Sequence, residues 1–236
     1  MTLNIKDKPK DGFERVVYAE EDKFNFYSVI AIHNTKRGPA LGGCRYFNYQ
    51  DFNKQEEDVL KLAEAMTYKN SLAELPFGGG KATIHSKINK KDAYSLFGEV
   101  LNKLNGTYIT AGDMGTVDED LRGFREYSDH VCNPIGSDSG LGTALGVYYS
   151  MLGCVEFKFG QDSLVNKNIF IKGYGKTGSR IASLCKKDGA NIEISDLEHK
   201  KDLIERDGYK FCSQLQDTSF EKIDIYSPCA GGGDLN

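Results

Sequence analysis

The sequence predicts an α/β protein of two domains, over residues 1–134 and 135–236. Three observations predict this architecture. Strand-like and helical patterns alternate over residues 13–127. They alternate again over residues 168–227, in a rhythm typical of a parallel sheet with crossover helices. Between these stretches, residues 132–142 are small and polar, as expected of a domain junction.

The first domain is expected to open with strands. Residues 1–11 are charged and predicted to be loose, whereas residues 13–19 and 26–33 are rich in Val, Ile, Tyr and Phe, which is typical of strands. Residues 34–43 predict an irregular loop because they contain two prominent breaker pairs: Gly38-Pro39 and Gly42-Gly43. A third strand is predicted over residues 45–49.

A long helix is predicted next, over residues 53–75. Its apolar positions recur at the spacing of one buried helix face: Val59, Leu62, Met66 and Ala73. Lys69 falls on that same predicted face. Three glycines at positions 78–80 then lead into a predicted strand over residues 81–85.

The rest of the first domain predicts two helices and a strand. Asn89 is a typical N-cap for a helix that Gly106 ends. A short strand is predicted over residues 108–111. Thr116 and Glu119 have the spacing of a capping box, which predicts a helix through residue 127.

The second domain is predicted to start with a connecting helix over residues 143–157. Three strands are then expected, at residues 168–172, 191–195 and 223–227. Helices are predicted between them, at residues 176–187 and around 200–207.

Composition argues against several classes of protein. The chain has 34 acidic and 30 basic residues, a net charge of −4, and so no strong attraction for nucleic acid. No apolar run approaches the roughly 20 residues that span a bilayer, and no signal-peptide pattern opens the chain. The six cysteines form no C-x-x-C pair and no metal-ligand spacing. We therefore expect reduced cysteines, no metal, no membrane contact and a cytoplasmic location.

A glycine motif follows the strand predicted over residues 168–172, and a helix pattern follows the motif. In G-x-G-x-x-G the first glycine permits a tight turn, the second admits a pyrophosphate, and the third lets helix and strand pack closely. A glycine-rich turn alone often serves only chain reversal, but here Asp196 ends the next strand, 18 residues after Gly178, near the spacing of a ribose-binding acid. The second domain is therefore predicted to be a Rossmann-type domain that binds NAD, because an acid at this position repels the 2′-phosphate of NADP. The expected contacts to NAD are Gly173, Gly175, Lys176, Thr177, Gly178 and Asp196.

Three charged residues of the first domain allow two interpretations each. Lys69 is explained by a packed stem with an ammonium that extends to solvent. Lys81 is explained by a surface position after a flexible turn, although the preceding glycines would also let a small ligand approach the backbone. Asp113 is explained by an ordinary turn. Taken singly, each residue favours the structural interpretation.

Several segments together carry a resemblance. They are, in chain order, Gly38-Pro-Ala-Leu-Gly-Gly-Cys-Arg45, Met66-Thr-Tyr-Lys-Asn70, Gly78-Gly-Gly-Lys81, Tyr108-Ile-Thr-Ala-Gly-Asp113, Thr143-Ala-Leu-Gly146-Val and Ser227-Pro-Cys-Ala-Gly-Gly. With the dinucleotide motif, this series resembles the amino acid dehydrogenases of the glutamate, leucine, phenylalanine and valine group, and the leucine branch most. The resemblance spans residues 13–233.

The resemblance implies roles for individual residues. Lys81 would be the catalytic lysine, and Asp113 would assist proton transfer. Lys69 would hold the substrate carboxylate. The rest of the substrate site would be formed by Gly42, Gly43 and Thr143, where the threonine opens the junction helix and lies near the nicotinamide.

The implied reaction is the NAD-dependent oxidative deamination of an L-amino acid to a 2-oxo acid, ammonia and NADH. The resemblance also implies that the protein is a homo-oligomer. A branched-chain substrate such as leucine or valine is expected first, and phenylalanine or another aromatic amino acid is the alternative. Lys81 would need a pKa lowered from about 10.4 toward 7–8 to exchange protons near neutral pH. Burial and a second cation nearby would both lower it.

A doubly wound nucleotide-binding domain has six strands, and the predicted strands of the second domain extend only to about the fourth of them. A fragment of a longer protein is expected on this ground, because the active-site motifs show no decay. A shortened, non-catalytic module that binds nucleotide or pairs subunits is the alternative of a different class.

Overall fold

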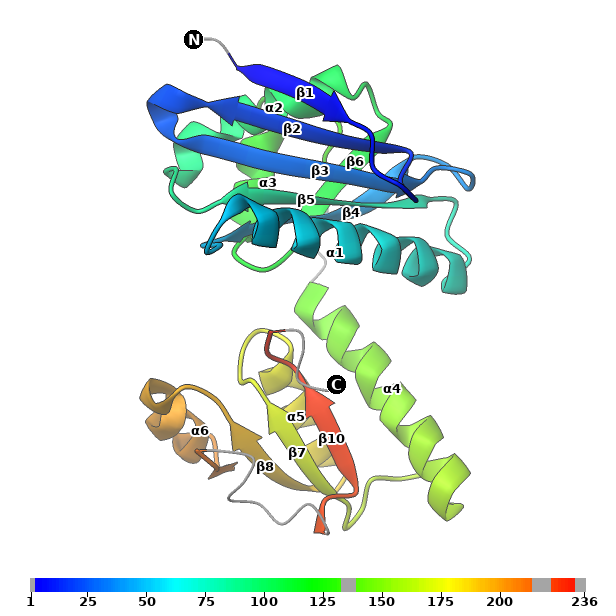
Figure 1. The fold of residues 1–236 in the computed structure, drawn as a ribbon. Coiled ribbons are helices and arrows are strands. Elements are labelled where there is room, and N and C mark those ends of the chain that lie inside the picture. The colour runs from blue at the N-terminus through cyan, green and yellow to red at the C-terminus, as the bar shows by residue number, and fades with distance from the viewer. Residues whose placement is uncertain (1–2, 133–138, 214–221, 232–236) are drawn as a thin grey trace. The chain divides into compact units, whose positions relative to one another are not determined.

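The computed structural model describes residues 3–132, 139–213 and 222–231 (Figure 1). The chain divides into two compact units, Met1–Asn133 and Pro134–Asn236. Within the described residues, unit 1 contains a six-stranded sheet and unit 2 a four-stranded sheet.

The sheet of unit 1 has the strand order β1-β2-β3-β5-β4-β6. Its strands are β1 (Asn4–Lys8), β2 (Arg15–Glu21), β3 (Phe26–Asn34), β4 (Ala40–Phe47), β5 (Gly78–His85) and β6 (Tyr108–Gly112). The first three strands and β5 pair antiparallel, whereas β4 pairs parallel with both β5 and β6. A 3₁₀ turn, η1 (Asp22–Phe24), joins β2 to β3.

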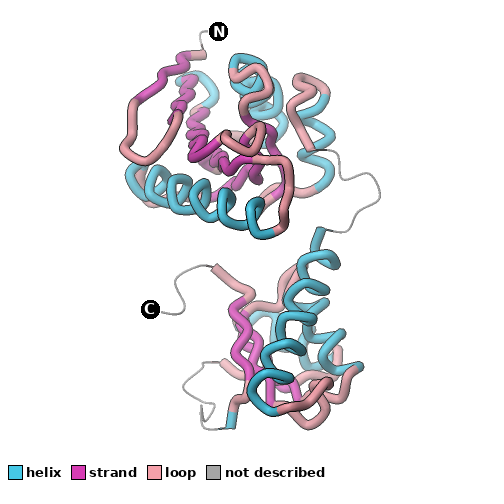
Figure 2. Tube along the Cα trace, turned by 90° about the vertical axis from the view of Figure 1, so that its right-hand side faces the viewer, coloured by secondary structure: helices cyan, strands magenta, loops and turns pink. Residues whose placement is uncertain are grey.

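Helices cover both faces of this sheet, as Figure 2 shows. On one face lies α1 (Phe52–Leu72), whose Val59 and Ala63 pack against β2 and β3 in a small apolar core. On the other face lie α2 (Lys90–Lys103) and α3 (Asp118–Arg125), which enclose the larger core with Ile84 and Tyr108. Alternate residues of each strand therefore face α1 or the α2–α3 layer.

Two predictions for the unit 1 strands were wrong. Residues 1–11 are not all loose, because β1 pairs with β2 and the partly buried Ile5 packs against the larger core. The expected loop at residues 34–43 ends at Ala40, where β4 begins, and the glycines at 78–80 belong to β5. Glycines normally weaken strands, but they are favoured where backbones approach closely.

The helix starts in unit 1 are set by side chains that accept backbone N–H groups. The predicted cap at Asn89 is confirmed, since its side chain accepts from the Lys91 N–H at 2.9 Å. The capping box at Thr116 was wrong. Instead α3 begins at Asp118, and the Asp120 carboxylate accepts from the Val117 N–H at 2.8 Å.

Unit 2 contains a fully parallel sheet with the order β10-β7-β8-β9. Its strands are β7 (Asn168–Lys172), β8 (Asn191–Ser195), β9 (Lys210–Phe211) and β10 (Ile225–Pro228). Its helices are α4 (Ser139–Phe159), α5 (Gly178–Lys187) and α6 (Lys201–Arg206), with a 3₁₀ turn η2 (Glu198–Lys200) before the last. Apolar residues of α4 and α5 pack together against β7 and β8.

One helix boundary and one strand of unit 2 differ from the prediction. The junction helix begins at Ser139, inside the stretch expected to be a linker, so Thr143 lies within α4 rather than at its start. The two-residue strand β9 was not predicted, because it is too short for a pattern to mark it. Part of the predicted junction, residues 133–138, lies outside the described residues.

Candidate active site

The site of unit 1 is built on the face of β5 that α1 covers. Gly79 faces the helix, because a Cβ there would lie only 2.1 Å from the Thr67 backbone nitrogen. Thr83, four residues on, faces it too and accepts a hydrogen bond of 3.1 Å from Gln55. Lys81 lies between them on the same face and is only 5% exposed.

Close packing of three strands at this point explains the glycine pair of β4. A Cβ on Gly42 would lie 1.7 Å from the Gly80 carbonyl oxygen, and a Cβ on Gly43 would lie 2.8 Å from the Asp113 Cβ. Since Gly43 carries no side chain, the side chain of Asp113 can come over β4 to the neighbouring β5. Gly43 therefore lies beside the carboxylate, whereas Gly42 allows β4 to approach the backbone of β5 next to Lys81.

The centre of the site is a carboxylate shared by two cations. Lys81 Nζ lies 2.9 Å from Asp113 Oδ2, and Arg45 Nε donates to the same oxygen at 2.9 Å. Asp113 follows β6, and its backbone N–H donates to Thr116 Oγ1 at 2.8 Å. The Thr116 hydroxyl in turn donates to the Cys44 carbonyl of β4 at 2.7 Å, which ties the turn after β6 to the sheet.

Burial and charge act in opposite directions at this pair. Burial lowers the pKa of Lys81, and the attraction of Asp113 does not fully restore it. Burial by itself raises the pKa of Asp113, but the charges of Lys81 and Arg45 outweigh burial and leave the pKa lowered. The site therefore contains a lysine prepared to lose its proton beside a carboxylate that stays ionised.

Arg45 is a site residue that the residue-by-residue sequence reasoning missed. Its NH1 group donates to both oxygens of Asp58 on α1, at 3.0 and 2.8 Å. The Tyr49 hydroxyl donates to Asp58 at 2.7 Å. Strand alternation could have found Arg45, since it lies two residues after Gly43 and so on the same face of β4.

Two other predicted substrate residues, Lys69 and Thr143, are exposed. The prediction that Lys69 lies on the buried face of α1 was wrong, because Lys69 is exposed. The buried positions of α1 are Gln55, Val59, Ala63 and Asn70. The neighbouring Asn70 side chain donates to the Gly78 carbonyl at 2.6 Å, which fixes this turn of α1 at the start of β5. Thr143 is exposed on α4 of unit 2.

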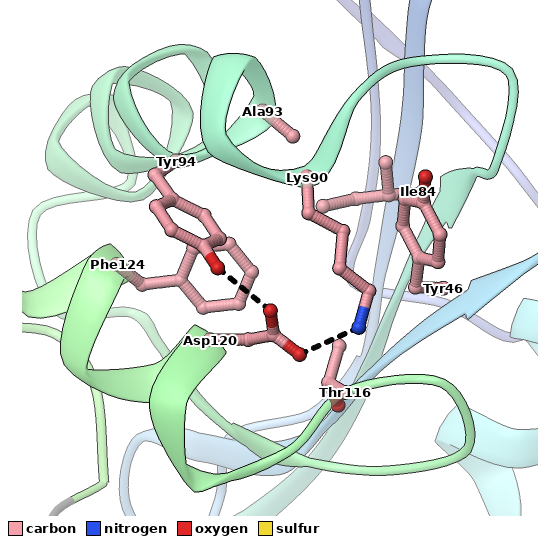
Figure 3. A pocket seen from close by; sticks show the side chains of 8 residues that line it. All are labelled: Tyr46, Ile84, Lys90, Ala93, Tyr94, Thr116, Asp120 and Phe124. Atoms are coloured by element: carbon pink, nitrogen blue, oxygen red, sulfur yellow. Dashed lines mark hydrogen bonds and ion pairs between the residues drawn. The ribbon is translucent and has the colours of Figure 1, made fainter.

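A second ionic cluster lies on the opposite face of the sheet (Figure 3). Asp120 accepts from Lys90 Nζ at 2.8 Å and from the Tyr94 hydroxyl at 2.7 Å, and is 3% exposed. The pocket beside it is about 10 Å³, the space of roughly one water molecule. It is lined by Tyr46, Ile84, Lys90, Ala93, Tyr94, Thr116, Asp120 and Phe124. The pocket is too small for an organic ligand, and the role of the cluster is to fix the start of α3 through Asp120.

In unit 2 the three glycines of the motif have three different surroundings. Gly173 has φ +105°, a conformation that favours glycine, and its N–H donates to the Ser195 carbonyl at 2.7 Å. A Cβ on Gly178 would lie 1.9 Å from the Gly173 oxygen, whereas Gly175 has no atom within 4 Å of its Cβ position. The loop is thus packed at its two ends and open at its middle, where a pyrophosphate has room to approach the N-terminus of α5.

Asp196 lies beside this loop. Its carboxylate accepts from the Tyr174 N–H at 2.5 Å, from the Leu197 N–H at 2.7 Å and from Lys200 Nζ at 3.1 Å. Burial alone would raise the pKa of Asp196, but these donors outweigh it and leave the pKa lowered. The ionised carboxylate can accept a ribose hydroxyl, so the loop and Asp196 fit a dinucleotide.

Known proteins are similar to this chain in sequence and in fold. The sequence model of a family described as "Glu/Leu/Phe/Val dehydrogenase, dimerisation domain" matches residues 14–129. A leucine dehydrogenase of Bacillus cereus is 34% identical over 248 aligned positions, which cover 100% of this chain and 67% of that protein. The chain belongs to the Glu/Leu/Phe/Val dehydrogenase family.

Other members of the Glu/Leu/Phe/Val dehydrogenase family are equally similar. The phenylalanine dehydrogenase of Thermoactinomyces intermedius is 37% identical over 95% of this chain and 64% of its own length. The crystal structure of L-tryptophan dehydrogenase from Nostoc punctiforme superposes with a TM-score of 0.69 at 28% identity, and covers 95% of this chain and 66% of that one. The chain thus spans about two thirds of the length of these relatives.

Two further observations concern the described residues of this family member. No helix among them is long and apolar enough to cross a membrane. They also include no cluster of three or more His, Cys, Asp or Glu side chains that could hold a metal ion.

Proposed function

We propose that this protein oxidatively deaminates an apolar L-amino acid to the 2-oxo acid and ammonia, with NAD as hydride acceptor. One observation carries the proposal: a buried lysine whose pKa is lowered lies 2.9 Å from an ionised carboxylate. Leucine or valine is the first substrate proposed and phenylalanine the second. Relatives named for leucine and for phenylalanine are equally similar to this chain.

In this mechanism, Lys81 works in its neutral form. Residues 173–178 and Asp196 would hold NAD, which would supply the acceptor for the hydride that the substrate Cα loses as the imine forms. The Lys81 amine takes a proton from the water that attacks the imine carbon, and returns it as ammonia departs. The lowered pKa of Lys81 makes this neutral form accessible near neutral pH.

Asp113 handles the proton of the substrate amine. Its Oδ2 is held by Lys81 and Arg45, and within the described residues no donor contacts its other oxygen. That oxygen can accept a hydrogen bond from the substrate amine and orient it, which would assist the transfer of its proton. Lys69 supports the proposal differently, because its exposed ammonium is available to a substrate carboxylate. Gly42 and Gly43 would line the substrate site, Thr143 would lie near the nicotinamide, and Lys176, Thr177 and Asp196 would complete the cofactor site.

We further propose that the first 134 residues form the substrate and oligomerisation domain of a cytoplasmic homo-oligomer. The match of residues 14–129 to a domain described as a dimerisation domain supports this.

NADH formation with a panel of L-amino acids tests the proposal. We expect absorbance at 340 nm to rise with L-leucine, L-valine or L-phenylalanine, and not with their D-isomers or 2-hydroxy analogues. Asp113→Asn should abolish the rise while leaving NADH binding intact. A protein that binds NADH but oxidises none of these amino acids would contradict the proposed reaction.

A further inference from the structure

We propose that Arg45, anchored by Asp58, is a positioning residue that holds Asp113 beside Lys81 and, as a second cation on the same oxygen, prepares the Lys81 ammonium to release its proton. The inference rests on the role proposed above for Lys81.

The geometry makes Lys81 and Arg45 competitors for one atom. Both nitrogens lie 2.9 Å from Asp113 Oδ2, so neither cation has the carboxylate to itself. By Coulomb's law, the attraction of Asp113 for each cation is unchanged by the other, but the two cations repel one another across the shared oxygen. This repulsion favours loss of a proton from the weaker base, which is the lysine.

Arg45 is fixed in this place from its other side. Its two contacts to Asp58 and the hydrogen bond from Tyr49 to Asp58 form a chain from α1 to the centre of the site. The Arg45 side chain is 17% exposed, and its planar guanidinium can use Nε and NH1 at the same time. An ammonium at this position could not bridge two carboxylates with the same fixed spacing.

The uncharged groups that surround Lys81 on neighbouring strands do not set its protonation. On the neighbouring β3, its register partner is the apolar Ala31. Cys44 of β4 is fully buried, and burial raises the pKa of its thiol so that it stays neutral. From α1, Asp58 acts through the Arg45 guanidinium that it holds, and Lys69 is exposed to solvent. The charges that act directly on Lys81 are therefore those of Asp113 and Arg45.

The test is the titration of Lys81 by NMR in protein labelled with ¹³C and ¹⁵N lysine, with the Lys81 signal assigned from a Lys81→Arg variant. Two variants should move the pKa of Lys81 in opposite directions. Arg45→Met removes the competing cation and should raise it by about 1. Asp58→Asn leaves the Arg45 charge uncompensated and should lower it. Arg45→Lys, which keeps a cation, should lie between the wild type and Arg45→Met.

A purely structural role for Arg45 would give a different pattern. Both variants would then loosen the site and shift the Lys81 pKa in the same direction, or not at all, and either result would overturn the inference. The acid limb of the pH profile of kcat should follow the NMR shifts. If the NMR shifts occur as expected and the pH profile does not follow, the proposed role of Lys81 fails while the control by Arg45 stands.

Discussion

Replacing Gly175 or Gly178 by alanine separates the two reasons for which the nucleotide loop needs glycine. A methyl group on Gly178 would lie 1.9 Å from the Gly173 carbonyl oxygen, about 1.5 Å inside the shortest ordinary contact. The atom it meets is part of the main chain and cannot rotate away. We therefore place the cost at the upper end of the overpacking range, about 3 kcal/mol. For a unit of this size, that lowers Tm by about 12–20 °C.

Gly175 should respond in the opposite way. Its Cβ position is open, and its φ lies outside the left-handed region, so alanine fits the loop without strain. The free energy of unfolding should rise by about 0.4–1 kcal/mol, because alanine has less freedom in the unfolded chain. NADH affinity should fall at least about tenfold, because the methyl group occupies the space through which a pyrophosphate approaches.

Calorimetry of the unit 2 transition and NADH fluorescence titration measure the two effects separately. NADH is excited at about 340 nm, where tyrosine does not absorb, and the chain has no tryptophan. Gly153→Ala on α4, another open glycine, is the matched control: it should raise Tm, because alanine is the better helix former, and leave NADH affinity unchanged. Unchanged NADH affinity in Gly175→Ala, or an unchanged Tm in Gly178→Ala, would refute this assignment of roles to the loop.

Three further predictions concern charged residues. Lys69→Ala should raise the KM for both the amino acid and the 2-oxo acid, because a carboxylate partner acts from the ground state onward; unchanged KM values in steady-state assays would leave Lys69 a surface lysine. Asp196→Ala should reduce the ratio of kcat/KM for NAD to kcat/KM for NADP, because it frees Lys200 to bind the 2′-phosphate. Equal kcat/KM values for the two cofactors in the wild type would contradict the role of Asp196. Asp120→Asn should lower the free energy of unfolding at pH 7 by about 2 kcal/mol, because a buried carboxylate loses charge-assisted hydrogen bonds from Lys90, Tyr94 and Val117. Because the pKa of Asp120 is lowered in the folded state, the ionised carboxylate adds to the free energy of unfolding above about pH 4, and this stabilisation is lost as the pH falls further. The free energies of unfolding of Asp120→Asn and the wild type, measured by denaturant melts, should therefore converge below about pH 4. A difference between them that stays constant with pH would argue against an ionic role.

The second unit was the more predictable from sequence because its pattern is local. A strand, a tight glycine turn and a helix N-terminus follow one another directly, and each glycine has a reason that is set within the motif. The acid at Asp196 lies at a fixed spacing, and its carboxylate does accept the Tyr174 N–H of the loop.

The site of unit 1 was less predictable because it depends on packing between distant segments. The glycines at 42–43 and 78–80 read as loops from sequence, since only the tertiary contact of β4, β5 and α1 explains a glycine within these strands. Periodicity placed Lys69 on the buried face of α1, although Asn70 occupies that face. The contact of Arg45 with Asp113 joins residues 68 positions apart, so alternation within β4 indicates the face on which Arg45 lies but not its partner.

The most direct test of the proton-transfer role of Lys81 is chemical rescue of Lys81→Ala. We expect kcat for amino acid oxidation to fall about 100- to 1,000-fold with NADH affinity unchanged, and small alkylamines to restore part of it in proportion to their concentration and basicity. A variant that keeps a tenth of wild-type turnover, or that no amine restores while its fold and NADH binding stay intact, would contradict the assignment of Lys81 as the acid–base group.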